Sequence, residues 1–216
     1  MNVIECVQGT PEWLAARAGR ITASRINDLM ATLKSGGEAA SRRNYRAQIV
    51  CEILTGKPQE SGFQSAAMKR GQEMEPLARA AYEVGSGQFM EQVGFVCHPT
   101  IDRAGCSPDG LILQDGLLEI KCPESATHLD YLIAKVVPSD YKNQMLFQMA
   151  VCEREWCEFV SYDDRMPDHL QIFKIRFMRD EKRIREIEDE VRLFLSEVDA
   201  ILEKLSRIEV GNANHF

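Results

Sequence analysis

Two short polar segments at the edges of apolar runs constrain this chain most. Ser107–Gly110 reads Ser-Pro-Asp-Gly, and ten residues after Asp109 the chain continues with Glu119 and Lys121 at the end of a second apolar run. Gln114–Gly116 separates the two runs and has turn composition, so the segment predicts a β-hairpin. Asp109 then stands at the start of one strand and Glu119 on the other.

The predicted hairpin groups two acids and an amine. Side chains alternate along a strand, so Glu119 and Lys121 share one face while Ile120 points into the core with its carbonyl oxygen available as a ligand. Mg²⁺ prefers oxygen donors and takes one or two protein carboxylates, with water and phosphate oxygens filling the other positions. Lys121 would orient the attacking water. This is the inventory of a metal-dependent phosphodiesterase, with Mg²⁺ as cofactor and Mn²⁺ as a possible substitute.

Each half of the pattern has a structural interpretation when taken alone. Pro-Asp-Gly is a common turn, and Glu-Ile-Lys suits any half-exposed strand. Together, Cys106–Gly110 and Leu118–Pro123 resemble the PD-(D/E)xK nuclease superfamily and, more narrowly, the phage lambda exonuclease or YqaJ-type viral recombinase family. The resemblance implies an α/β fold with a mixed central β-sheet flanked by helices.

The resemblance also implies the metal-site residues. Glu75, within the helical stretch 65–84, matches the glutamate of the family's Gly-x-x-x-Glu element, which supplies an extra carboxylate. The implied metal ligands are then Glu75, Asp109, Glu119 and the carbonyl of Ile120. The implied catalytic residues are Glu75, Asp109, Glu119 and Lys121.

Further matching positions imply recognition of a 5′-terminal phosphate. Arg17 and Ser24 match the family's N-terminal Ile-Thr-Ala-Ser region, and Gln144 matches a glutamine that faces the active site, with Gln148 one turn further on the same helix face. Ser107 would add a hydroxyl donor. Ser24 could instead cap the helix that follows it, and capping is compatible with anion binding at a helix N-terminus.

One position departs from the family pattern. Where the family carries an arginine after the Lys-Cys-Pro segment, this chain reads Thr127-His128. A phosphate contact expected there would be absent, or supplied by His128 or Lys135.

Composition favours one domain, residues 1–216, in the cytoplasm. The 216 residues are 44% hydrophobic and contain no long Pro/Gly/Ser-rich linker. No run approaches the ~20 apolar residues of a membrane span, so no membrane contact is expected. Seven cysteines form no Cys-x-x-Cys pair, and the four histidines lack zinc-ligand spacing.

Charge is distributed unevenly along the chain. The net charge is −7, yet residues 1–70 contain 10 Lys and Arg against 6 Asp and Glu. Attraction between Lys or Arg and the phosphates of the DNA backbone supplies most sequence-independent affinity for DNA, so this basic part is the predicted DNA-facing surface. Nine of these ten residues are the candidates for contact with DNA: Arg17, Arg20, Arg25, Lys34, Arg42, Arg43, Arg46, Lys69 and Arg70.

Periodicity predicts the order of the elements. Helical patterns cover 11–18, 25–33, 41–54, 65–84 and 139–152, and strand patterns cover 92–97, 103–106, 110–113, 117–121, 157–162 and 170–177. A long C-terminal helix carries an apolar stripe at alternating steps of three and four, formed by Ile184, Ile187, Val191, Phe194, Val198, Ile201 and Leu205. We expect this stripe to pack on the sheet, with a subunit contact as the alternative.

The family resemblance completes the functional expectation. It implies a Mg²⁺-dependent 5′-to-3′ exonuclease that degrades one strand of linear double-stranded DNA from its end and leaves 3′ single-stranded overhangs for recombination. It also implies a ring-shaped homotrimer and a single-strand annealing protein as partner. Two alternatives remain open: an endonuclease of restriction or repair type, and a catalytically inactive DNA-binding recombination protein.

Overall fold

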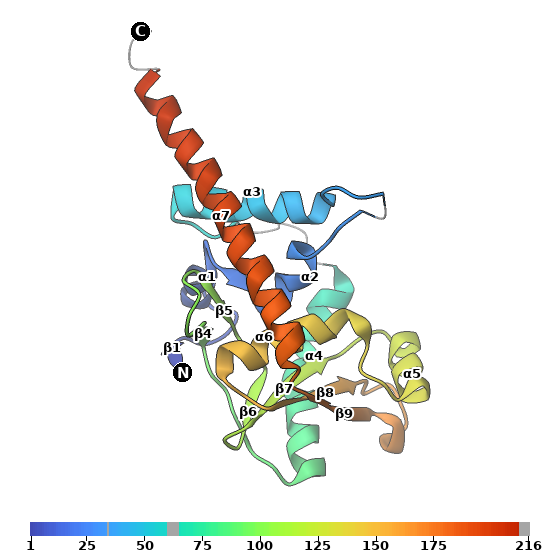
Figure 1. Ribbon diagram of the computed structural model, residues 1–216. Helices are drawn as coiled ribbons and strands as arrows, with labels where there is room; N and C mark the ends of the chain where they lie inside the picture. The colour runs from blue at the N-terminus through green and yellow to red at the C-terminus, as the bar shows by residue number, and fades with distance from the viewer. Residues whose placement is uncertain (34, 60–64, 212–216) are drawn as a thin grey trace.

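The strands divide between two mixed sheets. The computed structural model describes residues 1–33, 35–59 and 65–211 (Figure 1). One sheet has the order β1-β4-β5-β2, formed by Asn2–Ile4, Phe95–Cys97, Ala104–Cys106 and Ile21–Thr22. The other has the order β3-β6-β7-β8-β9, formed by Met90–Glu91, Gly110–Ile112, Gly116–Lys121, Trp156–Tyr162 and Ile172–Met178. The predicted α/β class is confirmed, and its sheet is split in two.

The β6–β7 hairpin forms as predicted. Gly110 pairs with Leu118 and Ile112 with Gly116 in antiparallel register, so the turn is 113–115, one residue earlier than the sequence suggested. A Cβ on Gly116 would lie 2.3 Å from the Trp156 ring, which explains why a glycine begins β7. β7 then pairs in parallel with β8, and this places the end of the hairpin in the middle of the larger sheet.

Helices surround the sheets. They are α1 Pro11–Arg17, α2 Ile26–Leu29, α3 Ala40–Thr55, α4 Ala66–Ser86, α5 Ser125–Ala134, α6 Ser139–Cys152 and α7 Glu181–Gly211. No described helix combines the length and apolar character needed to cross a membrane.

The predicted helix over 25–33 is wrong in extent. A 3-10 turn at Ala23–Arg25 leads into α2, which ends at Leu29. The chain then turns back, because Thr32 bridges to Glu38 and the glycines at 36 and 37 adopt positive φ angles that favour a loop over a helix. Ser24 therefore lies within the 3-10 turn and does not cap a helix. Helix α5 has no counterpart in the sequence-based prediction.

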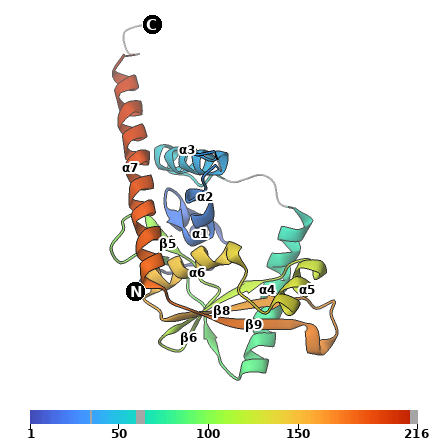
Figure 2. The same ribbon diagram turned by 45° about the vertical axis from the view of Figure 1, so that its right-hand side comes forward.

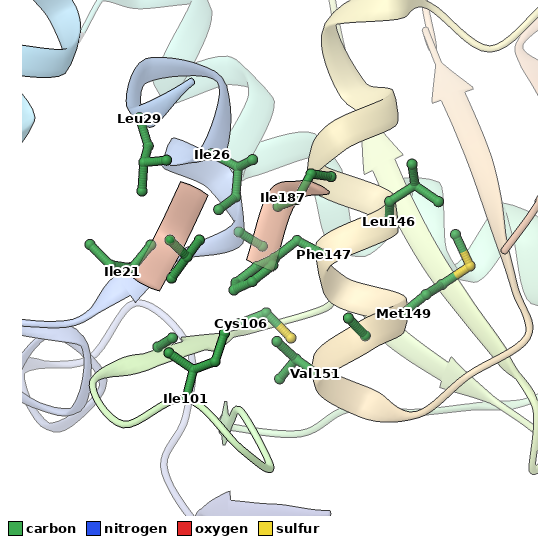
Figure 3. Close-up of a cluster of buried hydrophobic side chains, with 14 of the residues drawn as sticks. Ile21, Ile26, Leu29, Ile101, Cys106, Leu146, Phe147, Met149, Val151 and Ile187 are labelled. Atoms are coloured by element: carbon green, nitrogen blue, oxygen red, sulfur yellow. The ribbon is translucent and has the colours of Figure 1, made fainter. Parts of the chain in front are cut away.

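Helix α6 forms the centre of the molecule. Every side chain from Met145 to Cys152 is buried, which is the pattern of a helix enclosed on all sides. It packs against the strands of both sheets on one side and against α2 and α7 on the other. Figure 3 shows Phe147 of α6 among Ile21, Ile26 and Ile187. The two sheets, α2 and α7 therefore share one core through α6, and a second, smaller core lies between the larger sheet and α4.

The C-terminal stripe is buried mainly by helices. The stripe residues Ile184, Ile187, Val191, Phe194 and Val198 are buried, but α7 packs chiefly on α2, α3 and α6, so the expected packing on a sheet is wrong. Helix α6 already covers the face of the sheets that points toward α7. Arg42 and Arg46 of α3 each approach Glu197 of α7 to 2.6 Å, and Figures 1 and 2 show α7 running past α3 toward the C-terminus.

Candidate active site

The hairpin brings Asp109, Glu119 and Lys121 together. The backbone N–H of Ile120 donates to Oδ2 of Asp109 at 2.6 Å, which fixes the aspartate across the end of β7. The ammonium of Lys121 forms an ion pair with Oε1 of Glu119, two residues away on the same face. The structure therefore places the predicted acids and amine in one group, as strand alternation requires.

Two amides from α6 orient Glu119. Gln144 donates to Oε1 at 2.6 Å and Gln148 donates to Oε2 at 2.7 Å. Glu119 is almost fully buried, so these bonds compensate for the loss of water around its charge. Gln148 was not among the predicted site residues. Its signal was a second glutamine, one turn from Gln144, in the otherwise apolar stretch 145–152. We call Asp109, Glu119, Lys121, Gln144 and Gln148 the carboxylate cluster.

Pro108 explains why the carbonyl of Ile120 is available. In an antiparallel ladder the N–H and C=O of one residue point to the same neighbouring strand. The Gly110–Leu118 pairing, continued by two residues, would set Ile120 opposite Pro108, which has no N–H to donate. The carbonyl of Pro108 accepts a bond from Gln8 at 2.9 Å instead. The carbonyl of Ile120 therefore faces the side of Asp109 without a ladder donor from that proline.

The carboxylates of the cluster favour positive charge nearby. Burial and the neighbouring charges of Glu119 and Glu75 raise the pKa of Asp109 well above its usual value. Burial opposes the charge on Lys121, but Glu119 and Asp109 outweigh it and the pKa of this ammonium is raised. Lys121 is thus held as a cation, and the acids would gain from a second cation nearby.

Glu75 lies close enough to influence Asp109 but is held by its own helix. Its Oε1 accepts from Arg79, one turn further along α4, at 2.7 Å. Within the described ranges, no three His, Cys, Asp or Glu side chains form a metal-ligating group by themselves. An ion at this site would therefore rely on Asp109, Glu119, the Ile120 carbonyl and water. That donor set fits Mg²⁺, which usually takes only one or two carboxylates.

The residues predicted for the terminal phosphate lie around Trp13. The guanidinium of Arg17 stacks 4.1 Å from the centre of the Trp13 ring, and its Nη2 donates to the hydroxyl of Ser24 at 3.4 Å. The indole N–H of Trp13 donates to Oγ of Ser107 at 2.8 Å. We call Trp13, Arg17, Ser24 and Ser107 the N-terminal cluster. Ser107 precedes Asp109 by two residues, so this cluster adjoins the carboxylate cluster.

A cavity of about 470 Å³ opens beside the N-terminal cluster. Arg17 and Arg25 both line it, and Arg25 stacks 4.3 Å from the centre of the Tyr45 ring. The buried Glu52 accepts the N–H of Gly19 at 2.8 Å and supplies the acidic part of the wall. Two stacked guanidiniums at one opening suit a planar or anionic group.

Other predicted contacts lie elsewhere. Gln144 belongs to the carboxylate cluster through its bond to Glu119. His128 is buried, 2.7 Å from the hydroxyl of Ser161 and 2.8 Å from the carbonyl of Leu170, so it holds α5 in place and is not exposed to a phosphate. Lys135 is exposed and ends α5.

Part of the predicted basic surface is neutralised within the fold. Arg42 and Arg46 bind Glu38 and Glu197, and Arg25 binds Asp28 at 2.5 Å. These arginines join elements as well as contributing charge. Lys34 lies outside the described residues.

The comparisons with known structures agree with this geometry. The chain has the fold of an alkaline exonuclease: it is 46% identical to LHK-Exo from Laribacter hongkongensis, solved also in complex with dAMP, with a TM-score of 0.86 over 94% of this chain and 99% of that one. A phage-related exonuclease from Haemophilus somnus shares the fold at 14% identity, with a TM-score of 0.68 over 86% of this chain and 96% of that one.

The family follows from the sequence match. Residues 12–155 match the YqaJ-like viral recombinase domain, and the chain belongs to that family. A search of curated proteins gave no match. The matched range includes both the N-terminal cluster and the carboxylate cluster.

Proposed function

We propose that this protein is a Mg²⁺-dependent exonuclease that degrades one strand of linear double-stranded DNA from its 5′ end. It releases mononucleotides and leaves a 3′ single-stranded overhang for recombination. The observation that carries the proposal is the convergence of Asp109, Glu119 and Lys121 at the end of one hairpin. The nuclease character of the family's solved relative supports it.

The chain's own residues divide the chemistry. Asp109, Glu119 and the carbonyl of Ile120 would hold the metal, with Glu75 as a further carboxylate nearby. When bound, Mg²⁺ lowers the pKa of water and neutralises charge on the scissile phosphate. Lys121 donates to the attacking water and fixes its direction. Gln144 keeps the Glu119 carboxylate in one orientation, so that no reorganisation is needed during the reaction.

The N-terminal cluster would select the DNA end. A 5′-terminal phosphate needs a cationic fork and hydroxyl donors, which Arg17, Ser24 and Ser107 offer. Trp13 supports this role because it contacts both Arg17 and Ser107 and so ties their positions together. The short chain distance from Ser107 to Asp109 would set the terminal phosphate one nucleotide from the reacting one.

Assembly and partners are part of the same proposal. A protein with a net charge of −7 gains little general attraction for DNA, so enclosure of the duplex by a homotrimeric ring would keep it bound through many cycles. A single-strand annealing protein would take up the exposed 3′ strand. Light scattering at micromolar concentration tests the ring: a mass of three chains supports it, and a stable monomer that digests processively would contradict it.

One assay separates the proposed activity from its alternatives. A linear duplex labelled at its 5′ or 3′ ends is digested with Mg²⁺, beside a closed circular duplex of the same sequence. Early release of labelled mononucleotide from the 5′ ends only, with the circle intact, supports the proposal. Cutting of the circle would identify an endonuclease, and binding of DNA without any cutting would identify an inactive recombination protein.

A further inference from the structure

Asp163 is a fully buried carboxylate at the end of β8. Its Oδ1 accepts from Arg165 through the backbone N–H at 3.1 Å and through Nε at 2.7 Å. Its Oδ2 accepts from Nη2 of Arg165 at 3.2 Å and from Oγ of Ser125 at 2.6 Å. Arg70 adds a longer contact from Nη2 to Oδ1 at 3.4 Å, and the same Nη2 forms a closer ion pair with the adjacent Asp164. Three distant segments of the chain therefore meet at one acid.

This acid is ionised in the folded protein. Burial would raise the pKa of Asp163, but the bonds from Arg165 and Ser125 outweigh burial and lower it to about 2. A buried charge is tolerated only while its partners stay in place. We call Asp163, Arg165, Ser125 and Arg70 the joint. Its geometry is fixed, because moving any of the three partners would leave the buried charge of Asp163 unpaired.

The joint holds the chain directly after Lys121. Arg165 also donates to the carbonyl of Pro123 at 3.2 Å and to the carboxylate of Glu124 at 2.9 Å. Ser125 is the first residue of α5. The link 122–124 between β7 and α5 is therefore held by the bonds from Arg165 to Pro123 and Glu124, and at its end by the bond from Ser125 to Asp163.

The same joint holds the helix that carries Glu75. Arg70 lies in α4, and the adjacent Gly71 lies beside the link, since a Cβ there would be in ordinary contact, at 4.0 Å, with the carbonyl oxygen of Cys122. Helix α4 also packs on β7. This part of α4 therefore lies beside the residue that follows Lys121.

We propose that Asp163 is a positioning residue for the reaction of the carboxylate cluster. Through Arg165, Ser125 and Arg70 it fixes the end of β7 against α4, and so sets Lys121 and Glu75 relative to Asp109. It touches none of the reacting groups. Position matters at this point because a displacement of about 1 Å in a catalytic group can cost about 10²-fold in rate.

Amide hydrogen exchange tests the joint without any reliance on activity. Asp163→Asn keeps the shape and removes the charge, and Asp168→Asn makes the same change at an exposed site in the same β8–β9 connection. Asp163→Asn should speed exchange in residues 121–125 by about tenfold or more relative to Asp168→Asn, with α7 unchanged. Unchanged exchange in 121–125 would overturn the proposal. If Asp163→Asn fails to fold, Arg165→Lys tests the same joint with a milder change.

A rate measurement then tests the catalytic consequence, which rests on the proposed function. The single-turnover cleavage rate of Asp163→Asn should fall at least about tenfold while its dissociation constant for duplex DNA stays within about twofold. The double variant with Arg165→Lys should be no slower than the slower single variant, because both act through one joint. Equal rates for Asp163→Asn and wild type would overturn the positioning role. A wild-type protein without nuclease activity would overturn the proposed function instead, and the exchange result would still decide the joint.

Discussion

The carboxylate cluster and the N-terminal cluster adjoin each other but are built differently. Each carboxylate oxygen of Glu119 is bound by an amide of α6, and Asp109 is tied to the backbone of β7. Arg17 instead stacks on Trp13 at the edge of a cavity, and Ser24 is exposed. The first cluster is held rigidly, as the proposed chemical step requires. The second leaves space for a ligand, as expected for a site that selects DNA ends.

The largest effect should come from removing charge in the carboxylate cluster. Glu119→Gln keeps the size of the side chain but loses the charge that pairs with Lys121, and the cleavage rate should fall on the order of 10³-fold. Glu158→Gln is the matched control, because Glu158 lies on the neighbouring strand and binds Tyr82 on the other face of the sheet. Single-turnover digestion of a labelled duplex measures both. A Glu119→Gln rate near that of the control would remove the distinction between the two clusters.

Glu75 should matter less than Glu119, since Arg79 holds it at the margin of the cluster. Glu75→Ala should slow cleavage about 10²-fold and raise the Mg²⁺ concentration needed for half-maximal rate. Glu73→Ala, an exposed change on the same helix, should leave both values unchanged. Titration of the initial rate with Mg²⁺ gives the comparison. No change in the Mg²⁺ requirement would place Glu75 outside the metal site.

Arg17 should affect the choice of substrate more than the chemical step. A duplex with a 5′ phosphate should be cut about tenfold faster than one with a 5′ hydroxyl, since a charge-assisted bidentate contact is worth roughly 1.5–3 kcal/mol. Arg17→Ala should erase most of this difference and leave the rate on the 5′-hydroxyl duplex intact. Arg185→Ala, an exposed change on α7, controls for loss of positive charge. Equal losses on both substrates would show that the N-terminal cluster acts in the chemical step as well.

The smallest effect concerns how stability depends on pH through His98. His98 is buried, its Nδ1 accepts the N–H groups of Thr100 and Ile101 at 3.2 Å each, and its Nε2 lies 3.3 Å from Glu188 of α7. Burial lowers the pKa of His98, although Glu188 opposes this and Arg192 and Glu153 also act on it.

The sign of the pH effect follows from that shift. Because the folded pKa lies below the unfolded value of about 6.5, the unfolded state binds the proton first, and stability falls as pH drops below about 6.5. His98→Asn can accept the same backbone bonds through its side-chain oxygen without titrating. Its melting temperature should therefore decline less than that of wild type between pH 7.5 and 5.5. An equal decline would assign the acid sensitivity to other groups.

The sequence predicted best the structural features that depend on residues close together in the chain. The hairpin with Asp109, Glu119 and Lys121 follows from turn composition and strand alternation, both local rules. Helix α5 was missed because its first turn is anchored by Asp163, about forty residues away, and by the burial of His128. Such long-range contacts leave no periodic signal.

The same reason limits the prediction of the site. Trp13 contacts Ser107, 94 residues further along the chain, as well as Arg17, and no spacing rule connects Trp13 to Ser107. The helix expected over 25–33 ended early because a bridge from Thr32 to Glu38 competes with it. The packing of α7 on helices could not be foreseen either, since a stripe shows that a face is buried but not what covers it.

Chelation of the metal shows whether the carboxylate cluster is a metal-dependent nuclease centre. The digestion rate of a linear 5′-phosphorylated duplex is recorded with Mg²⁺, after addition of a chelator, and after restoration of Mg²⁺, for wild type and Asp109→Asn in parallel. We expect wild type to stop with the chelator and to resume with Mg²⁺, and Asp109→Asn to stay inactive throughout. Digestion that continues in the chelator, or an Asp109→Asn protein that cuts as fast as wild type, would contradict it.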